Sequence, residues 1–332
     1  MTDREAAQAV ADAGKQLLAE KLVVRTWGNM SCRTGQSTFM ITPSGLAYEH
    51  MTAQDVVAYH MEDQSWTGER KPSSERGIHA QAYRIFPDAG FVIHTHQTYA
   101  SALGLAGFAP DDFSAQEKET LGGIAKAAYG LPGTARLRRH VTAAMQTGAH
   151  TVLMAQHGAL IVGRTMEETL ARAVSLENAC KKRYQGKFVQ RACDQAQTEA
   201  LMQQTKSLAP YIVCTAAAAV LEVAATERFI RAQLDDMAQM IGCKLMAVPP
   251  TREAVLAGLQ KHCAVLVPGV GALCKASSVG DAEAMPALVE KACVCHVHTR
   301  TLGEKATLSF LDTALMWTVY QAKYSKKAEG EA

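Results

Sequence analysis

The sequence has no appreciable excess of charge of either sign. Its 34 lysine and arginine residues are balanced by 32 aspartate and glutamate residues, which gives a net charge of +2. Proteins that bind nucleic acids usually carry a concentrated basic patch, and the chain has no extended basic block. A nucleic-acid partner is therefore not expected, and any phosphate group would be bound locally.

Long hydrophobic runs and an export signal are also missing. The longest apolar run, residues 212–225, contains Thr215 and Glu222 and is shorter than the roughly 20 residues that a membrane-spanning helix needs. The first residues, Met-Thr-Asp-Arg-Glu, do not form a cationic region followed by an apolar one. We therefore expect a cytoplasmic protein with no membrane partner, in which the nine cysteines are reduced thiols.

The composition is that of a protein with a buried core, because 48% of the 332 residues are hydrophobic and 20% are charged. A single core rarely extends beyond about 250–300 residues, so we expect two domains. A polar, glutamine-rich stretch at 190–210 marks the boundary. We assign residues 1–190 to the first domain and residues 200–332 to the second.

Hydrophobic periodicity predicts an α/β fold in both halves. In the first half, helices are expected at 7–21, 74–86, 98–105, 134–147 and 165–187. The strands expected there are 26–33, 38–42, 55–59, 91–94, 151–155 and 159–162. In the second half, we expect helices at 226–241, 251–261, 281–298 and 306–324, and strands at 244–248, 264–267 and 272–275.

The second half also contains an internal similarity to the first. When the sequence is displaced by 113 residues, Gly158 aligns with Gly271 and Cys180 aligns with Cys293. Any strand–turn–strand–helix unit produces some matches of this kind, which is the simpler alternative. We interpret residues 200–332 as a diverged partial copy of the end of the first domain, with a structural or oligomerisation role and no metal of its own.

Three histidines form the strongest candidate site. His94 and His96 are two residues apart in a predicted strand, where alternate side chains point to the same face, and His157 closely follows the strand expected at 151–155. Three neutral imidazoles suit zinc and leave a coordination position open for a substrate. Histidines two apart also occur as ordinary strand residues, so the spacing alone leaves both interpretations open.

Three turns have the composition of phosphate-binding turns, because exposed turn amides and helix N-termini attract anions. These turns contain Gly28 and Asn29, Ser44 and Gly45, and Ser73 and Ser74. The same residues have structural explanations as turn formers or helix caps. Glu75 follows the third turn, where it could complement the helix dipole or act as a catalytic base.

Five short segments, taken in order, form a distinctive set. They are Gly28-Asn29-x-Ser31-x-Arg33, Ile41-Thr42-Pro43-Ser44-Gly45, Lys71-Pro72-Ser73-Ser74-Glu75, His94-Thr95-His96 and Gln156-His157-Gly158. Over residues 3–188 the chain resembles the class II aldolase/adducin family, typified by fuculose-phosphate aldolase.

This resemblance implies a three-layer α/β/α domain followed by a smaller α/β domain. It implies zinc, or another divalent metal, bound by His94, His96 and His157, with Glu75 as the acid/base. The implied phosphate pocket is formed by Gly28, Asn29, Ser44, Gly45, Ser73 and Ser74. It also implies a homo-oligomer, usually a tetramer with active sites between subunits.

The activity that the resemblance implies is that of a metal-dependent aldolase acting on a small ketose, preferably a phosphorylated one. The bound metal would stabilise an enediolate while Glu75 moves the proton. The alternatives are a sugar-phosphate 4-epimerase, a decarboxylase or dehydratase on the same scaffold, and a non-catalytic adducin-like scaffold. The epimerase branch carries aspartate at the position of Glu75, and a scaffold would be expected to have lost metal ligands.

The chain departs from the family pattern in two ways. The aldolases have a tyrosine that helps to protonate the aldehyde oxygen, and the corresponding stretch 113–117 contains none, so the proton donor is unassigned. The family's usual chain also ends near the position of Lys187, whereas this chain continues.

Three further features have simpler structural explanations. The stretch 293–298 contains four potential ligands, but we expect it to be helical, and a helix cannot turn all four toward one ion. His79 is expected on a helix surface. A leucine-rich stripe predicts a core or subunit contact and consists of Leu308, Leu311, Leu315 and Val319.

Overall fold

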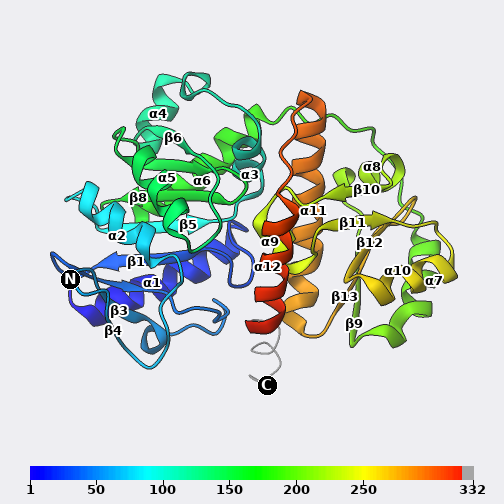
Figure 1. Ribbon diagram of the computed structural model, residues 1–332, viewed down its shortest axis with the longest axis horizontal. Coiled ribbons are helices and arrows are strands. Elements are labelled where there is room, and N and C mark those ends of the chain that lie inside the picture. Colours follow the sequence, from blue (N-terminus) through cyan, green and yellow to red (C-terminus); the bar gives the residue numbers. More distant parts are fainter. Residues whose placement is uncertain (324–332) are drawn as a thin grey trace. The chain divides into compact units, whose positions relative to one another are not determined.

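The computed structural model describes residues 1–323, and the chain divides into two units, Met1–Tyr184 and the part that begins at Gln185. Figure 1 labels their elements. The helices of the first unit are α1 (Asp3–Ala19), η1 (Ala53–Asp55), α2 (Arg76–Ile85), α3 (Thr98–Leu105), η2 (Pro110–Asp112), α4 (Ala115–Leu121), α5 (Ala135–Met145) and α6 (Met166–Arg183). Its strands are β1 (Asn29–Arg33), β2 (Thr38–Ile41), β3 (Val57–His60), β4 (Trp66–Thr67), β5 (Phe91–Thr95), β6 (Ile124–Ala127), β7 (Thr151–Met154) and β8 (Gly158–Gly163).

Several helices of this unit begin at a threonine whose hydroxyl accepts a backbone amide of the first turn. Thr2 caps α1, where Glu5 completes a capping box, and Thr134 and Thr165 cap α5 and α6. Such caps satisfy amides that have no partner inside the helix. In α6, acidic residues in the first turn and basic residues in the last also complement the helix dipole.

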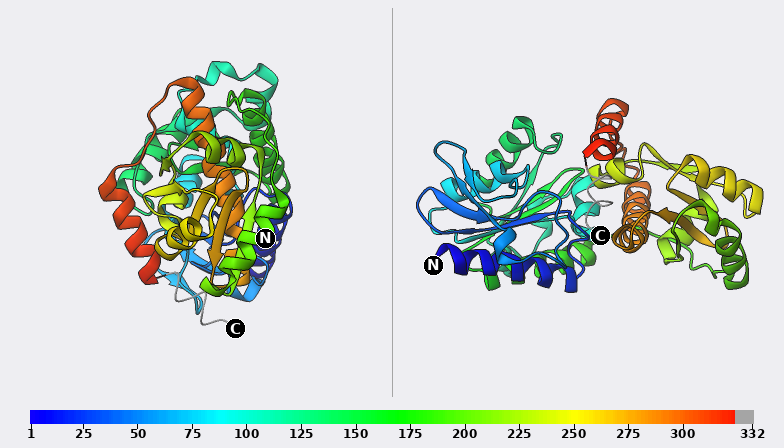
Figure 2. Two further views of the ribbon diagram at one scale, coloured as in Figure 1. Left: turned by 90° about the vertical axis from the view of Figure 1, so that its right-hand side faces the viewer. Right: turned by 90° about the horizontal axis from the view of Figure 1, so that it is seen from below.

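The first unit is built around one eight-stranded sheet in the order β4-β3-β2-β1-β5-β8-β7-β6. The pairs are antiparallel except for β6 and β7, which are parallel. Strands β5 and β8 are therefore central, and alternate residues of each strand face opposite sides of the sheet. Figure 2 shows α1 lying along one face of this sheet.

Each face of the sheet has its own hydrophobic core. On one face, Ile93 and Ile161 pack with residues of α1, α3 and α6. On the other face, Val92 and Leu160 pack with residues of α2 and α5. These three layers confirm the α/β/α fold expected from the sequence.

The second unit is a smaller α/β fold. Its helices are α7 (Gln195–Thr205), η3 (Lys206–Leu208), α8 (Ala218–Thr226), α9 (Asp235–Met240), α10 (Arg252–Lys261), α11 (Val279–Leu302) and α12 (Phe310–Lys323). Its strands are β9 (Tyr211–Thr215), β10 (Phe229–Arg231), β11 (Lys244–Ala247), β12 (Ala264–Val267) and β13 (Gly271–Ala276), in the sheet order β10-β11-β12-β13-β9. Residues of α7 and α10 pack on one face of the sheet, and α11 and α8 contact strands of the same sheet.

The second unit also shows where local patterns misled the sequence analysis. The helix expected at 226–241 is wrong, because residues 229–231 instead pair with β11 as an edge strand and only α9 is helical. The apolar run at 212–225 contains two elements: β9 holds its β-branched residues and α8 its alanine-rich part. The short elements α4 and β6 were also missed.

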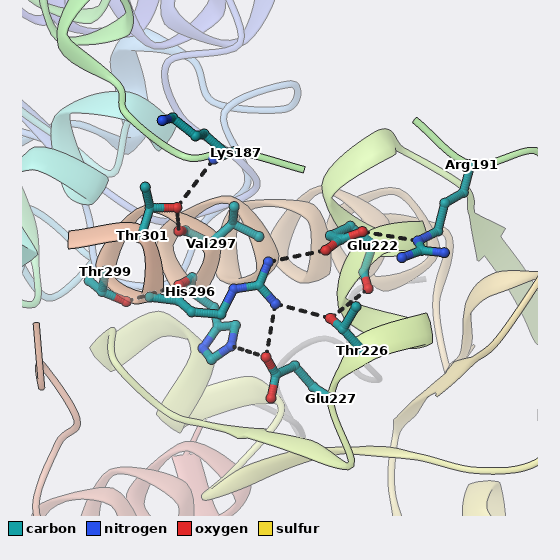
Figure 3. Close-up of polar contacts among 10 residues, drawn as sticks. Lys187, Arg191, Glu222, Thr226, Glu227, His296, Val297, Thr299 and Thr301 are labelled. Atoms are coloured by element: carbon teal, nitrogen blue, oxygen red, sulfur yellow. Dashed lines mark hydrogen bonds and ion pairs between the residues drawn. The ribbon is translucent and has the colours of Figure 1, made fainter. Parts of the chain in front are cut away.

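A network of ion pairs holds the segment that enters the second unit. Arg191 donates to Glu222 at 2.9 Å, and Arg300 on α11 donates to Glu222 and to Glu227 at 3.2 and 3.0 Å. The backbone amide of Lys187 donates to the Thr301 hydroxyl. Figure 3 shows these contacts converging from α8, α11 and the entering segment. The path of residues 187–191 is thus fixed by polar contacts within the unit.

The central sheet depends on a glycine just before β5. A Cβ atom at Gly90 would lie 2.2 Å from the Arg164 carbonyl oxygen. We predict that Gly90→Ala lowers the free energy of unfolding by about 1–3 kcal/mol or more, because backbone must move to relieve the overlap. Thermal and denaturant unfolding measure this change. Gly107→Ala, where a Cβ atom would meet nothing within 4 Å, is the control, and equal losses in the two variants would contradict the prediction.

Candidate active site

The end of β5 carries two of the three candidate metal ligands. His94 lies in β5, His96 follows the strand directly, and His157 lies in the turn between β7 and β8. Since β8 pairs with β5 so that Ala159 is opposite Thr95, the residue two positions before Ala159 lies beside the end of β5. The topology therefore brings the third histidine to the first two.

A glycine allows this close approach. A Cβ atom at Gly158 would lie only 2.1 Å from the Thr95 carbonyl oxygen, so a larger residue would push the turn away from β5. Two positions before this glycine, Gln156 has a positive φ of 62°, which completes the tight turn. The Gln156-His157-Gly158 motif thus positions an imidazole as well as supplying it.

The three imidazoles meet at one point. The Nε2 atom of His94 lies 3.0 Å from the Nε2 atoms of both His96 and His157, and one ligand atom from each residue lies within 4.8 Å of the others. His94 Nδ1 is 2.9 Å from the Ala159 carbonyl oxygen, to which it must donate. Its Nε2 therefore presents a lone pair to its neighbours.

This arrangement fits a divalent metal ion. Lone pairs held about 3 Å apart in a buried site repel unless a cation or a proton lies between them. A backbone carbonyl that fixes the second nitrogen of a ligating histidine is typical of metal sites. Among residues 1–323, this is the one group of three or more candidate ligands close enough to share an ion.

Glu75 lies against the same histidines. It is the N-cap residue of α2, and its carboxylate oxygens are 3.0 Å from His157 Nε2 and 3.2 Å from His94 Nε2. Burial raises the pKa of this carboxyl, but the positive charge that His94 and His157 carry when they are protonated, together with their hydrogen bonds, holds it well below its usual range. Glu75 is therefore present as a carboxylate that can accept a proton.

A buried chain of hydrogen bonds leads to Glu75 from the far side. The side-chain NH2 group of Asn29 donates to the Glu75 carboxylate at 3.1 Å, and the side-chain carbonyl of Asn29 accepts from His79 Nε2. The Nδ1 atom of His79 then accepts from the Ser31 hydroxyl at 2.7 Å, and that hydroxyl accepts from Tyr83 at 2.8 Å. Each donor finds an acceptor in this order, which orients the Glu75 carboxylate.

His79 must be neutral to play this part. Burial, with a smaller effect from His94, lowers its pKa to about 3. The helix-surface position expected for His79 is wrong, because the side chain is fully buried. Its spacing from Glu75, four residues along the same helix, was the signal that both side chains face inward.

The three glycine- and serine-containing turns lie around this centre. Gly28 packs so closely that a Cβ atom would lie 2.5 Å from the His94 carbonyl oxygen. The other two turns are joined to each other, since the Ser44 amide donates to the Lys71 carbonyl and the Ser73 amide donates to the Thr42 carbonyl. Gly45 and Ser44 are partly exposed, and Ser74 is exposed.

Two of the residues expected to bind phosphate also have internal partners. Asn29 is buried between His79 and Glu75. The Ser73 hydroxyl accepts a hydrogen bond from the backbone amide of Glu75 at 3.2 Å. Ser73 therefore fixes the backbone at the start of α2, where Glu75 is the N-cap residue. The amide of Asn29 is therefore used to orient the carboxylate.

The other candidates are not part of the histidine cluster. The stretch 293–298 is part of α11, as expected, and His296 is 3.3 Å from Glu227 (Figure 3). In the leucine-rich stripe, Leu308 is buried but Leu311 is 79% exposed, so the stripe is only partly a core contact. Phe113 is buried among apolar residues, and the 113–117 stretch supplies no tyrosine.

Comparison with known proteins identifies the family. Residues 8–184 match the family described as class II aldolase and adducin N-terminal domain. The chain belongs to this family. Members of the class II aldolase family typically depend on a divalent metal, and the His94, His96 and His157 cluster agrees with this property.

The chain is also similar to individual known proteins. The chain is 36% identical, over 172 residues, to a 5-methylthioribulose-1-phosphate/5-deoxyribulose-1-phosphate aldolase of Rhodospirillum rubrum, which covers 52% of this chain and 76% of the relative. The structure of YgbL of Klebsiella pneumoniae, described as a putative aldolase/epimerase/decarboxylase, is 22% identical to this chain with a TM-score of 0.51. The match covers 55% of this chain and 89% of YgbL and shows that the fold is shared. An L-fuculose 1-phosphate aldolase structure is 29% identical with a TM-score of 0.48 over 54% and 84% of the two chains.

Every helix within residues 1–323 is too short or too polar to cross a lipid bilayer.

The histidine cluster leads to a prediction about metal content. We expect His94→Ala and His157→Ala to reduce the bound divalent metal to a small fraction of the wild-type content, since each leaves two imidazoles in a site that already has an open position. Metal analysis of the purified proteins measures this. His50→Ala, at an exposed position, should keep the wild-type content. Unchanged metal in both site variants would mean that these residues are not the ligands.

The hydrogen-bond chain leads to a second prediction. His79→Leu should lower turnover by roughly 10–100-fold while metal content is retained, because Asn29 no longer holds the Glu75 carboxylate in place. Tyr83→Phe, which removes only the far hydroxyl, should have a smaller effect. Steady-state kinetics with metal analysis and thermal unfolding test this. Equal kcat values in wild type and a folded, metal-loaded His79→Leu protein would rule out the positioning role.

Proposed function

We propose that this chain is a metal-dependent lyase that cleaves or forms a carbon–carbon bond of a small ketose phosphate. The observation that carries the proposal is the convergence of three imidazoles, two of them buried, and the Glu75 carboxylate on one point. An aldol reaction needs these two functions together, a site for a Lewis acid beside a proton acceptor.

Zinc is the cation that we propose for this site, since three neutral imidazoles suit it and leave a position open. When bound, such an ion supplies electrostatic stabilisation of the negative charge that develops on the substrate carbonyl oxygen. His94, His96 and His157 would hold it. His94 and His157 are buried, at 0% and 2% exposure, and His96 is partly exposed, so solvent contact with two of the three imidazoles is limited.

The proton transfer falls to Glu75. In the direction of cleavage, Glu75 takes the proton from the substrate hydroxyl, the bond between the carbon next to the carbonyl and the hydroxyl-bearing carbon breaks, and an aldehyde leaves. Glu75 then returns a proton to the carbon that has gained the electron pair, and in the direction of synthesis it removes that proton. The Asn29 amide orients the carboxylate for this transfer, and Ser73 holds the backbone at Glu75.

A sugar phosphate is the substrate class that we propose. Support comes from the 36% identical relative, whose name specifies ribulose-1-phosphate derivatives, and from the turns beside the centre. The backbone amides of Gly28, Gly45 and Ser74 and the serine hydroxyls of these turns would supply the phosphate contacts, with Asn29 at their edge. The Ser44 and Ser73 amides instead join the two turns to each other.

The alternatives differ in what leaves the substrate. A 4-epimerase, decarboxylase or dehydratase would use the same ligands, and an adducin-like scaffold would use none. We favour the lyase over the epimerase because the epimerase branch carries aspartate at the position that Glu75 occupies here, 3.2 Å from His94 Nε2. A retained ligand set also argues against a scaffold.

We also propose roles for the rest of the molecule. Residues 1–190 would form the zinc-binding domain, and residues 200–332 a diverged partial copy with a structural or oligomerisation role. Exposed apolar residues on α12, including Leu311 and Leu315, support a homo-oligomer, for which a tetramer is our proposal. The location that we propose is the cytoplasm.

The experiment is a cleavage screen on the metal-loaded protein with an aldehyde readout. Ketose 1-phosphates and their unphosphorylated forms should be compared, and each reaction analysed for epimers, carbon dioxide and water loss. The proposal expects aldehyde release from a phosphorylated ketose. Release of carbon dioxide, or epimerisation without an aldehyde, would favour the corresponding alternative.

Replacement of the carboxylate gives a sharper prediction. Glu75→Gln should keep the metal but lower kcat by about 10²–10⁴-fold, since an amide cannot accept the proton. Glu49→Gln, a matched change at an exposed position, should leave kcat close to wild type. Near-normal turnover by Glu75→Gln at full metal occupancy would remove Glu75 from the mechanism.

A further inference from the structure

The second unit repeats the framework of the first from α2 onward. The correspondences, in chain order, are α2 with α7, β5 with β9, α3 with α8, α4 with α9, β6 with β11, α5 with α10, β7 with β12, β8 with β13 and α6 with α11. The sheet order β5-β8-β7-β6 of the first unit returns as β9-β13-β12-β11 in the second, and β6–β7 and β11–β12 are the parallel pairs. The repeat therefore begins earlier than the sequence similarity indicated.

Strand register fixes the correspondence residue by residue. In the first unit Thr95 is opposite Ala159, and in the second Thr215 is opposite Ala272. The two strand pairs then continue over the same length to their other ends.

The glycine at the tight turn gives an independent check. A Cβ atom at Gly158 would lie 2.1 Å from the Thr95 carbonyl oxygen, and a Cβ atom at Gly271 would lie 2.2 Å from the Thr215 carbonyl oxygen. The residues two positions before these glycines, Gln156 and Gly269, both have positive φ. The backbone that surrounds the metal centre of the first unit is thus present in the second.

The side chains at this place are different. The register puts Cys214 at the position of His94, Ala216 at that of His96 and Val270 at that of His157. We had expected the copy to begin after the elements that carry these equivalents, and that expectation is wrong. The positions exist, but none of the three imidazoles does.

Two thiols meet there instead. Cys193 lies just before α7, as Ser73 lies just before α2. Its Sγ atom is 3.4 Å from the Val270 carbonyl oxygen, and the Sγ atom of Cys214 is 3.8 Å from the same oxygen. Because both sulfur atoms approach the same oxygen, their separation cannot exceed the sum of these two distances, and Cys193 acts electrostatically on Cys214. Both residues are partly exposed.

Cys193 is held in this place by the contacts on either side of it. Two residues earlier, Arg191 is paired with the buried Glu222 (Figure 3). One residue later, the Asp194 amide donates to the Gly269 carbonyl at 2.8 Å. The loop position is therefore anchored to the same turn that carries Val270.

We propose that Cys193 and Cys214 form a redox-reactive dithiol pair at the position that the metal centre occupies in the first unit. The co-reactant is a small disulfide such as oxidised glutathione. The Cys193 thiolate attacks one sulfur of the oxidant, forms a mixed disulfide and releases one glutathione thiolate. Cys214 then attacks the Cys193 sulfur, so that the second glutathione leaves as a thiolate and takes up the Cys214 proton.

The order of these steps follows from the environment. Burial, with a smaller effect from Cys193, raises the pKa of the Cys214 thiol to about 11. Cys214 thus stays protonated near neutral pH and is the slower attacking group. Cys193, on the anchored loop, makes the first attack, and overall two thiols are oxidised as one disulfide is reduced.

The test uses the reduced full-length protein, treated with oxidised glutathione, alkylated and digested without reductant. Mass spectrometry should show the peptide with Cys193 linked to the peptide with Cys214, two hydrogens lighter than the separate peptides. The link should disappear in Cys193→Ser and in Cys214→Ser. It should persist in Cys243→Ser, a matched change at another partly exposed cysteine of the unit.

A second probe tests proximity without oxidation. Phenylarsine oxide bridges two neighbouring thiols and loses its oxygen as water, so the reduced protein should bind one equivalent that Cys193→Ser loses and Cys243→Ser keeps. Cys193→Ser changes a loop residue, so this arm holds even if Cys214→Ser fails to fold. Glutathione that stays on Cys193 without transfer to Cys214, or a link that forms equally with other cysteines, would overturn the proposal.

Discussion

Three imidazoles lie at the end of β5, and the Nε2 atom of His94 is 3.0 Å from that of each of the other two. His94 donates from Nδ1 to a backbone carbonyl, so its Nε2 presents a lone pair in a site where water is scarce. Such a cluster is stable only with positive charge between the nitrogens. The surrounding structure meets this constraint by placing β8 between β5 and β7 and by admitting a glycine at 158.

The same constraint explains the polar residues behind the site. Glu75 contributes negative charge beside the imidazoles, and it is oriented by Asn29, which is in turn held by a neutral His79. A buried polar chain of this kind is stabilising only when every donor has an acceptor. The Tyr83 and Ser31 hydroxyls complete the chain of hydrogen bonds, so the Glu75 carboxylate is oriented by residues on the side away from the histidines.

The sequence predicted the histidines and Glu75 of the site better than the residues that orient them through hydrogen bonds. His94 and His96 share a strand face, and the ordered motifs identified the family, so the cluster could be predicted. The role of His79 could not, because its partners Asn29 and Ser31 are far away in sequence and meet it only through the sheet. In the second unit, β10 and β9 were missed because their strand character depends on pairing with β11 and β13.

The second unit repeats the backbone of the first unit at this place but not its side chains. Its strand register and its glycine turn follow those of the first unit, yet Cys214, Ala216 and Val270 stand where three histidines stand in the other. A displacement of 113 residues aligns only the last elements of the two units. The segment between β6 and β7, which contains α5, is longer than the segment between β11 and β12, which contains α10. The correspondence of the earlier elements becomes visible only from the register in which β9 pairs with β13.

The central claim is that the first unit holds one divalent cation between His94, His96 and His157. Anomalous diffraction from crystals of the full-length, zinc-loaded protein, recorded on both sides of the zinc absorption edge, tests it most directly. The account predicts one strong peak within coordination distance of the three Nε2 atoms. Empty density between those nitrogens in a zinc-loaded crystal, or a strong peak bound by other residues in its place, would contradict it.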